Sequence, residues 1–391
     1  MSDTRKTTKP NVPNLRFPGF SGEWASRRIG EDCTVNMCKR IFANQTSEQG
    51  DVPFFKIGTI GGTPDAYITR DLFEEYKAKY NYPHEGEVMI TCAGTVGKTI
   101  VFDGEDAYFQ DSNIVWLSNP KQLYINSFLN YVLSRVNWNI LNSTTITRIY
   151  NDNLRELVIN YPSIKEQEKI VALLSLLDRR IAIQNKVIED LKKLKTALEE
   201  RMLGQCQGKQ VRLRDILIER VEKSRINNQY EVLSSTVSGI YSQREYFNKE
   251  IASADNTGYK AIHRGDVVLS PQNLWMGNIN YNDRFEIGIV SPSYKVFSID
   301  EKFDKGYIAF LLKTRKALWA YSLVSEQGAS IVRRNLNYES FLEISFVIPS
   351  LKEQQATARM LSAFQQKHMM EEAFLRSLLL QKEFMLKSLF I

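Results

Sequence analysis

Two stretches of the chain carry apolar residues at alternating three- and four-residue steps, the spacing of a heptad helix. They cover 162–203 and 349–390, and Pro162 of the first corresponds to Pro349 of the second. The apolar seam positions are Leu174, Leu177, Ile181, Ile188, Leu191 and Leu198, followed in the second stretch by Leu361, Phe364, Leu375, Leu378, Met385 and Leu389. Because an apolar face must be buried, we predict that the two helices pair as a coiled coil.

Charged residues in the seams favour an antiparallel pair. A parallel pair would place Lys195 against Lys382, whereas an antiparallel pair brings Glu371 within about one turn of Lys192 and Lys195. Residues near Ile181 should then lie beside Lys382. The alternative is two amphipathic helices that pack separately on their own domains, and the shared register argues against it.

Short apolar runs predict the elements of the first half of the chain. Strands are expected at 52–60, 87–93, 98–103, 113–118 and 157–163, and a helix at 124–136. Pro162 then ends strand pairing and begins the long helix.

The second half repeats this order. The segments 210–216 and 263–270 resemble 26–32 and 84–91, and 303–318 resembles the helix at 124–136. A strand within 343–350 then leads into the second long helix. Such a repeat predicts a duplicated unit with approximate twofold symmetry.

We therefore predict an α/β fold of the mixed α+β kind, with two repeated globular domains that are each followed by a long helix. The expected parts are a flexible arm (1–13), the first domain (14–158), the first coiled-coil helix (159–203), a hinge (204–208), the second domain (209–345) and the second coiled-coil helix (346–391).

Composition agrees with two folded domains, because 391 residues with 43% hydrophobic and 25% charged residues lie in the globular range. A net charge of +6 permits a nucleic-acid partner. The four cysteines form no CxxC motif and have no metal-ligand spacing to histidine, which argues against disulfides and zinc. Without an apolar run of roughly 18 to 20 residues or a signal peptide, we expect a cytoplasmic protein with no membrane segment.

Two short motifs resemble catalytic motifs, but the sequence argues against a catalytic role for both. The segment 92–99, CAGTVGKT, ends like a phosphate-binding loop, but Cys92 stands where the first glycine is required. It remains either a turn that brings Thr95 and Lys98 near an anion or a plain connection between strands. Asp65 and Glu75 loosely match a nuclease pattern, but Glu75 lies in a charged helical segment.

No methyltransferase or nucleotide-hydrolysis motif is present, and we expect His84 and His263 to be structural, so no catalytic residue and no metal site is predicted. Polar and basic loop residues remain, of the types that contact bases and phosphates. The candidates for DNA contact are Lys39, Arg40, Thr95, Lys98, Gln110, Ser112, Asn113, Thr145, Arg148, Gln272, Asn273, Arg333, Arg334 and Asn335.

Several segments together resemble the specificity (S) subunits of type I restriction-modification systems. They are LRFPGFSGEW at 15–24, PSIKEQEKI at 162–170, PSLKEQQAT at 349–357, and the Gly-[Glu/Asp]-Val strands at 86–90 and 265–269. The resemblance implies two target-recognition domains that each bind one half of a bipartite double-stranded DNA target. It also implies an antiparallel coiled coil that sets the spacer between the half-sites.

The resemblance further implies partners that carry out the chemistry. Two methyltransferase (M) subunits would dock on the helices and bind S-adenosylmethionine, and restriction (R) subunits that use ATP and Mg²⁺ would bind through them. This chain would hold no cofactor. The second long helix lacks the counterparts of Glu168 and Ile170, which leaves open whether both helices dock a methyltransferase equally. The alternatives are the specificity component of a related type II methyltransferase-nuclease and a coiled-coil adaptor that does not bind DNA.

Overall fold

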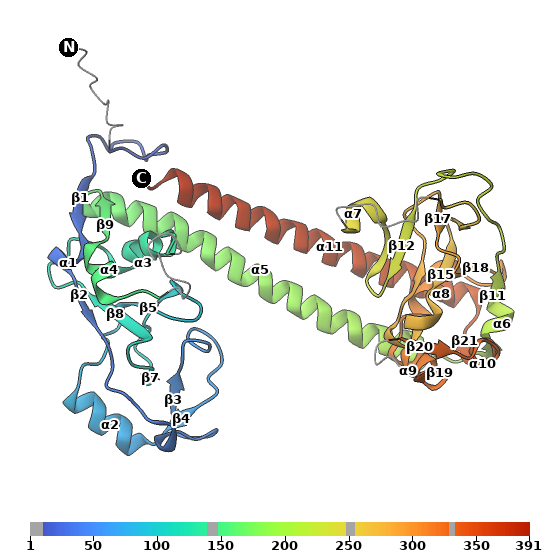
Figure 1. The fold of residues 1–391 in the computed structure, drawn as a ribbon, viewed down its shortest axis with the longest axis horizontal. Helices are drawn as coiled ribbons and strands as arrows, with labels where there is room; N and C mark the ends of the chain where they lie inside the picture. Colours follow the sequence, from blue (N-terminus) through green and yellow to red (C-terminus); the bar gives the residue numbers. More distant parts are fainter. Residues whose placement is uncertain (1–10, 139–147, 248–254, 328–332) are drawn as a thin grey trace, which may run out of the picture. The chain divides into compact units, whose positions relative to one another are not determined.

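The computed structural model describes residues 11–138, 148–247, 255–327 and 333–391 (Figure 1). The chain divides into two compact units, residues 1–183 with 375–391, and residues 184–374. Each unit therefore contains one globular domain and part of both long helices. In the ranges that the structure describes, no helix is both long and apolar enough to cross a membrane.

An antiparallel four-stranded sheet forms the frame of the first unit, in the order β2-β8-β5-β6. The strands of this unit are β1 (Ala25–Arg28), β2 (Thr34–Asn36), β3 (Val52–Phe55), β4 (Tyr67–Ile68), β5 (Val88–Thr91), β6 (Thr99–Val101), β7 (Tyr108–Phe109), β8 (Ile114–Ser118) and β9 (Val158–Tyr161). Its helices are α1 (Ile29–Asp32), the 3₁₀ helix η1 (Ala43–Gln45), α2 (Arg70–Lys79), α3 (Asn126–Ser134), α4 (Asn151–Glu156) and the start of α5 (Ile164–Gly204). The helix predicted at 124–136 and the strands predicted at 87–93, 98–103, 113–118 and 157–163 are confirmed, whereas the strand predicted at 52–60 ends at Phe55 and continues as a turn.

The second unit repeats the frame, with an antiparallel sheet in the order β11-β18-β15-β16. Its strands are β10 (Lys209–Arg212), β11 (Leu217–Glu219), β12 (Leu233–Thr236), β13 (Gly239–Ser242), β14 (Lys260–His263), β15 (Asp266–Leu269), β16 (Ile279–Tyr281), β17 (Ile287–Val290), β18 (Lys295–Ile299), β19 (Ser325–Gln327), β20 (Arg334–Leu336) and β21 (Ser345–Ile348). Its helices are α6 (Leu213–Ile216), α7 (Gln243–Phe247), the 3₁₀ helix η2 (Pro271–Met276), α8 (Lys305–Leu311), α9 (Arg315–Leu323), α10 (Tyr338–Glu343) and most of α11 (Leu351–Ser388).

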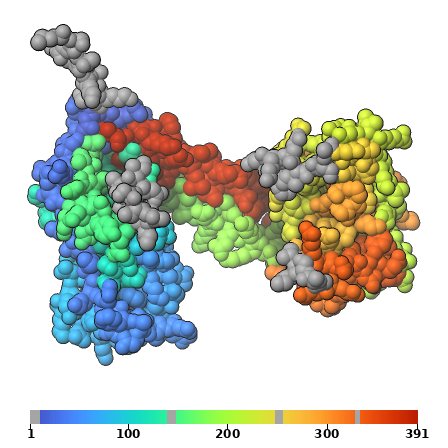
Figure 2. Space-filling model, viewed as in Figure 1, coloured from blue at the N-terminus to red at the C-terminus, as the bar shows by residue number. Residues whose placement is uncertain are grey.

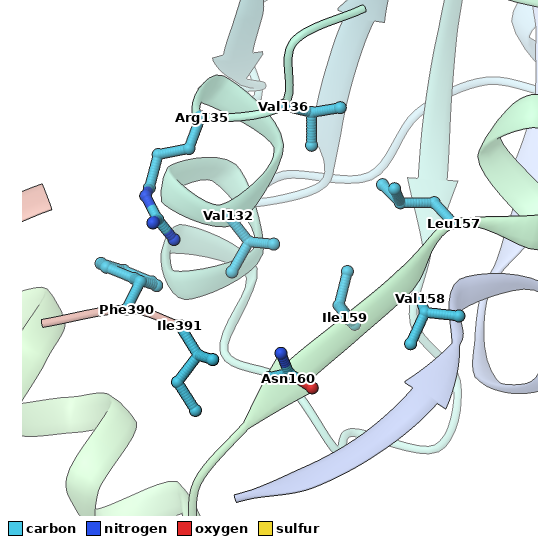
Figure 3. A pocket seen from close by; sticks show the side chains of 9 residues that line it. All are labelled: Val132, Arg135, Val136, Leu157, Val158, Ile159, Asn160, Phe390 and Ile391. Carbon is cyan, nitrogen blue, oxygen red and sulfur yellow. The ribbon is translucent and has the colours of Figure 1, made fainter. Parts of the chain in front are cut away.

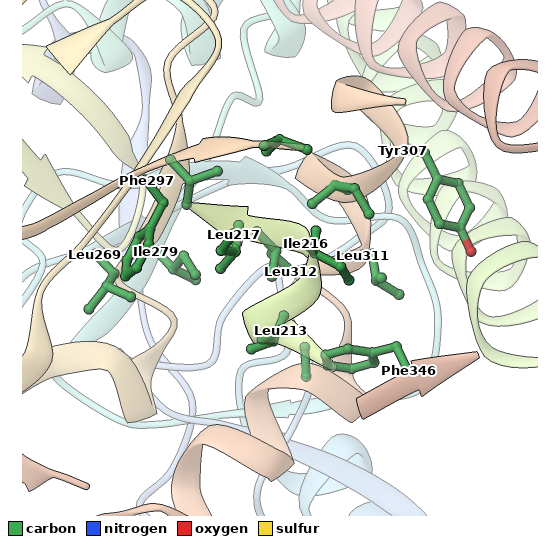
Figure 4. Close-up of a cluster of buried hydrophobic side chains, with 14 of the residues drawn as sticks. Leu213, Ile216, Leu217, Leu269, Ile279, Phe297, Tyr307, Leu311, Leu312 and Phe346 are labelled. Carbon is green, nitrogen blue, oxygen red and sulfur yellow. The ribbon is translucent and has the colours of Figure 1, made fainter. Parts of the chain in front are cut away.

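The core of each frame lies between the sheet and its helices. In the second unit Leu213 and Ile216 of α6 pack with Phe297 of β18 and Tyr307 of α8, all fully buried (Figure 4). A second apolar cluster in each unit includes residues of the frame sheet, such as Met89 and Val268, and here the two units differ. The first unit adds the sheet β4-β3-β7 with α2, whereas the second adds the pairs β12-β13 and β14-β17.

The segment 303–318, which resembles the helix at 124–136, forms two helices, α8 and α9, with a break between them. The hydroxyl of Thr314 accepts a hydrogen bond from the backbone N–H of Ala317 at 3.2 Å and caps a new helix. A threonine at this position satisfies an N–H group that would otherwise lack a partner at the start of α9.

The long helices α5 and α11 run antiparallel, as predicted. In the first unit Asp178 of α5 forms an ion pair with Lys382 near the end of α11. In the second unit the side chain of Gln184 donates to the backbone carbonyl of Glu371 at 3.1 Å and to its carboxylate. Contacts therefore move toward the start of α11 as they move along α5, which is the property of an antiparallel pair.

The expected approach of Glu371 to Lys192 and Lys195 does not occur. Glu371 contacts Gln184 and Lys367, while Lys195 pairs with Glu199 of its own helix. Gln184 and Glu371 occupy equivalent positions in the two repeats, and equivalent residues of an antiparallel pair meet at its centre. The two lysines lie farther along the helix than this centre.

Burial along the helices follows the heptad spacing. The buried and half-buried positions include Leu174, Leu177, Ile181, Gln184, Ile188, Leu191, Lys195 and Leu198 on the first helix, and Leu361, Phe364, His368, Glu371, Leu375, Leu378, Lys382, Met385 and Leu389 on the second. One continuous face of each helix is thus covered.

A buried glutamine fastens each domain to its long helix. The side chain of Gln167 accepts a hydrogen bond from the backbone N–H of Ile125, which precedes α3, at 2.8 Å and donates to the carbonyl of Pro162 at 3.0 Å. Gln354 repeats this arrangement, because it accepts from Asp304 at the start of α8 at 2.9 Å and donates to Pro349 at 2.9 Å. In each unit, the hydrogen bond from the residue before the domain helix joins that helix to the first turn of the long helix.

The N-terminal segment lies against the end of α11 within the first unit (Figure 2). The backbone N–H of Leu15 donates to Ser388 at 2.8 Å, and Arg16 forms an ion pair with buried Glu166 at 2.8 Å. Of the expected arm, residues 1–10 lie outside the described residues. Asn11 is not part of a free arm, because its side chain donates to the Trp24 carbonyl at 2.6 Å.

Candidate functional site

In the first unit, candidate residues gather where the β5–β6 connection meets the segment before α4. The backbone N–H of Ile149 donates to the carbonyl of Cys92 at 2.9 Å and joins the two segments. Within the connection, the hydroxyl of Thr91 accepts from the backbone N–H of Lys98 at 3.0 Å and donates to the carbonyl of Thr95. The segment 92–98 is therefore an ordered turn between antiparallel strands.

The turn before β8 brings two arginines to the same surface. Arg40 forms an ion pair with Asp111 at 2.9 Å, and Arg148 donates to the carbonyl of Ser112 at 3.3 Å. Ser112 has a φ of +53°, a left-handed conformation that is uncommon for residues other than glycine. The guanidinium of Arg148 also lies 5.9 Å from the centre of the Tyr150 ring.

The charge of Arg148 also acts on the buried thiol of Cys92, which lies beneath this surface. Burial raises the pKa of the Cys92 thiol to about 11, and the positive charge of Arg148 partly opposes this shift. Arg148 therefore places its charge close to the β5–β6 turn.

In the second unit, candidate residues gather where η2 meets β20. The guanidinium of Arg334 lies 4.1 Å from the centre of the Trp275 ring, a cation–π contact. Gln272 and Asn273 lie in η2 beside Trp275, and Asn335 follows Arg334 in β20. The ammonium of Lys313 donates to the carbonyl of Gly277 at 2.8 Å and fixes the end of η2.

These two surfaces occupy the same place in the two repeats. Each forms where the connection between two frame strands, β5–β6 or β15–β16, meets the segment before the last short helix, α4 or α10. An arginine stacked on an aromatic ring is present in both. Divergent loops on a repeated frame are typical of domains that bind different ligands in the same way.

The structure places the other predicted residues less uniformly. Gln110 accepts a hydrogen bond from the backbone N–H of Ile57 at 3.3 Å, and the ammonium of Lys98 donates to the carbonyl of Ile60, so both side chains support neighbouring loops. The backbone carbonyl of Asn113 accepts from Cys92 at 2.7 Å. Lys39 instead lies over the ring of Tyr80 at the end of α2. Arg333 precedes β20 and is exposed, and Thr145 lies outside the described residues.

Sequence reasoning missed the aromatic members of both surfaces, Tyr150 and Trp275, and the carboxylate of Asp111. Tyr150 is 60% exposed. An exposed aromatic residue close in sequence to an arginine is the signal that identifies the first pair, because cations stack on such rings. No local signal joins Trp275 to Arg334.

Residues of the rejected nuclease pattern contact other partners. Asp65 pairs with Lys56 at 3.1 Å, and Glu75 pairs with Lys79 within α2 at 2.8 Å. Within the described part of the chain, no three His, Cys, Asp or Glu side chains lie close enough together to hold a metal ion.

The two histidines of the repeated turn are part of the frame. The backbone N–H of His84 donates to the carboxylate of Glu87 at 2.8 Å, and His263 donates to Asp266 in the same way at 2.8 Å. Both carboxylates are buried. These bonds involve the backbone of the two histidines, so the structural role of their imidazoles stays a prediction.

A small pocket of about 220 Å³ lies between α3, β9 and the end of the chain (Figure 3). Val132, Ile159 and Phe390 form apolar walls, and the guanidinium of Arg135 lies 4.8 Å from the centre of the Phe390 ring. No acid–base pair is among its lining residues. The pocket therefore lacks the groups that a catalytic site requires.

Residues 21–193 match the profile of the type I restriction modification DNA specificity domain. This match spans most of the first globular domain and most of α5. A Haemophilus influenzae Rd protein named as a candidate type I restriction enzyme specificity subunit is 48% identical over 163 residues. That alignment covers 42% of this chain and 42% of the relative's own length.

Solved structures extend the likeness in fold to both repeats. The S subunit of a type I restriction-modification system from M. genitalium superposes with a TM-score of 0.61 over 97% of this chain and 99% of its own, at 18% identity. A chain from a study of complex assembly and conformational transition in the type I system gives a TM-score of 0.53 over 96% of this chain and 98% of its own, at 14% identity. The specificity domain and its long helix are thus part of a fold that spans nearly the whole chain.

Proposed function

We propose that this chain is the DNA-specificity subunit of a type I restriction-modification complex, and that each globular domain recognises one half of a bipartite target. The observation that carries the proposal is the pair of equivalent loop surfaces, each with an arginine stacked on an aromatic ring. Arginine and amide side chains donate the directional hydrogen bonds that distinguish bases in the major groove. The specificity-domain match over 21–193 supports DNA as the ligand.

The long helices have two roles in this proposal. As a continuous antiparallel pair they set the spacer between the half-sites. Their outward faces expose large apolar side chains that suit the docking of methyltransferase subunits: Leu176, Ile183, Val187 and Leu194 on α5, and Met369, Met370, Phe374, Leu379, Leu380 and Phe384 on α11. Exposed apolar patches of this kind are typical of protein interfaces.

Catalysis belongs to partner subunits in this proposal. Two methyltransferase subunits would bind S-adenosylmethionine, restriction subunits would use ATP and Mg²⁺, and the complex would act in the cytoplasm. The chain itself would contribute binding energy and base discrimination. Its net charge of +6 favours association with the phosphate backbone.

Mapping of methylated bases tests the proposal. A host without other methyltransferases would express the chain with its methyltransferase partner, and single-molecule sequencing would locate modified bases. We expect one bipartite motif with an unread spacer, and no motif when the chain is omitted. A gel shift that weakens as salt rises would accompany it. Absence of salt-dependent DNA binding would instead indicate a coiled-coil adaptor, and co-purification with a single fused methyltransferase-nuclease would indicate a type II system.

A further inference from the structure

Arg334 differs from most arginines of the second unit in what its guanidinium contacts. Six others form ion pairs with carboxylates: Arg212, Arg214, Arg220, Arg264, Arg284 and Arg315. The guanidinium of Arg334 lies on the Trp275 ring, and no carboxylate of the described residues pairs with it. The Trp275 ring therefore positions the guanidinium of Arg334 without neutralising its positive charge.

The contact with the Trp275 ring limits the positions that the guanidinium of Arg334 can adopt. A ring against the flat face of a guanidinium leaves the N–H groups, which lie in its plane, free to donate at the edge. The Nε atom of Arg334 is buried and has no hydrogen-bond partner among the described residues. With Nε buried, Nη1 and Nη2 are the donors of Arg334 that remain for a ligand.

We infer that Arg334 is a specificity-determining residue that donates two hydrogen bonds to O6 and N7 of a guanine in the half-site bound by the second domain. The inference rests on the proposed function. Two parallel N–H donors match these two acceptors, which adjoin each other only on guanine. The neighbouring amides Gln272, Asn273 and Asn335 are the other side-chain type that recognises base edges.

A phosphate contact is the competing explanation. A phosphate accepts hydrogen bonds from many directions, so a mobile lysine or arginine binds it without a supporting ring. The contact with Trp275 restrains the guanidinium, which matters when the acceptors lie in the plane of a base. If Arg334 contacts a guanine, its replacement changes the preference at one base pair. If it contacts a phosphate, its replacement weakens binding to all sequences equally.

The first test is Arg334→Lys, which keeps the positive charge and loses the two-pronged donor. In the methylation-mapping assay, we expect preference for one G·C pair in one half-site to fall roughly 5- to 150-fold, with every other position unchanged. Arg284→Lys is the matched control, because Arg284 also lies on an aromatic ring, Phe285, at 4.9 Å but is paired with Glu245 at 2.9 Å. Its motif should equal that of the wild-type chain.

A second test needs no variant and so does not depend on folding. The wild-type complex is bound to duplexes in which each guanine of the mapped motif is replaced in turn by 7-deazaguanine, which lacks the N7 acceptor. We expect one guanine in the half-site affected by Arg334→Lys to lose about 5-fold or more in affinity. Position-specific loss supports guanine recognition.

Three outcomes overturn the inference while the proposed function stands. They are an unchanged motif for Arg334→Lys, a uniform loss of methylation at all sites with the same motif, and equal binding of every 7-deazaguanine duplex. The last two indicate a phosphate contact or a structural role. A wild-type chain that directs no methylation motif would instead defeat the proposed function itself.

Discussion

Replacement of Gln167 by methionine should loosen the first domain from its long helix. Gln167 is fully buried, and its side-chain amide makes three hydrogen bonds, from Ile125 N–H at 2.8 Å and to the carbonyls of Leu123 and Pro162 at 3.0 Å. Methionine has a similar length and volume but no amide. Gln167→Met therefore removes all three bonds while it keeps most of the packing.

The cost follows from the number of bonds. Each hydrogen bond contributes about 1 kcal/mol net, so the loss of three should lower the free energy of unfolding of the first unit by about 2 to 3 kcal/mol. Gln354 makes two such bonds, to Asp304 and Pro349. Gln354→Met should lower the stability of the second unit by about 1 to 2 kcal/mol. Gln355→Met is the matched control, because Gln355 is exposed, and its effect should stay within about 0.5 kcal/mol.

Hydrogen exchange measured by mass spectrometry in increasing urea separates the two units, which need not unfold together. In Gln167→Met, the Ile125 amide and the first turn of α5 should exchange faster, while the second unit keeps wild-type protection. Gln354→Met should affect the Asp304 amide instead. Wild-type stability of Gln167→Met together with a protected Ile125 amide would refute the reasoning, because the amide would then contribute nothing beyond its volume.

Three further predictions concern the helices, the thiols and the absence of catalysis. One heptad inserted after Gln184 and another after Met370 lengthens both helices by about 10 Å, so methylation mapping should find the same half-sites and a spacer about three base pairs longer; an unchanged spacer would mean that the helices do not set it. Burial raises the pKa of Cys92 to about 11, so about one thiol in a thousand is ionised at pH 8. Iodoacetamide should therefore alkylate Cys92 slowly in the native chain at pH 8, faster as the pH rises toward 11, and fast at pH 8 in urea. Rapid alkylation of the native chain at pH 8 would contradict the burial of Cys92. The purified chain should leave plasmid DNA uncut in Mg²⁺, and cleavage that Asp65→Ala abolishes would revive the nuclease hypothesis.

The sequence by itself determined the repeated frame and the direction of the long helices. Heptad spacing is local, since a residue at the third or fourth step lies on the same helical face whatever the rest of the chain does. Short apolar runs predicted β5, β6 and β8 for the same reason, because the composition of a run of four to eight residues is equally local. Lys195 and Lys382 opposed a parallel pair through like charge alone, which needs no knowledge of the partner surface.

Contacts across the chain were decided only by the tertiary structure. The register that joins Gln184 to Glu371 depends on where each domain releases its helix, so the approach of Glu371 to Lys192 and Lys195 that was expected from the seam charges was wrong. The segment 303–318 broke into two helices because Thr314 caps a new start, although its apolar spacing permitted one. Trp275 meets Arg334 only because the η2 connection and β20 converge on one surface. Periodicity specifies which face of an element is buried, but which loops meet depends on the path of the whole chain.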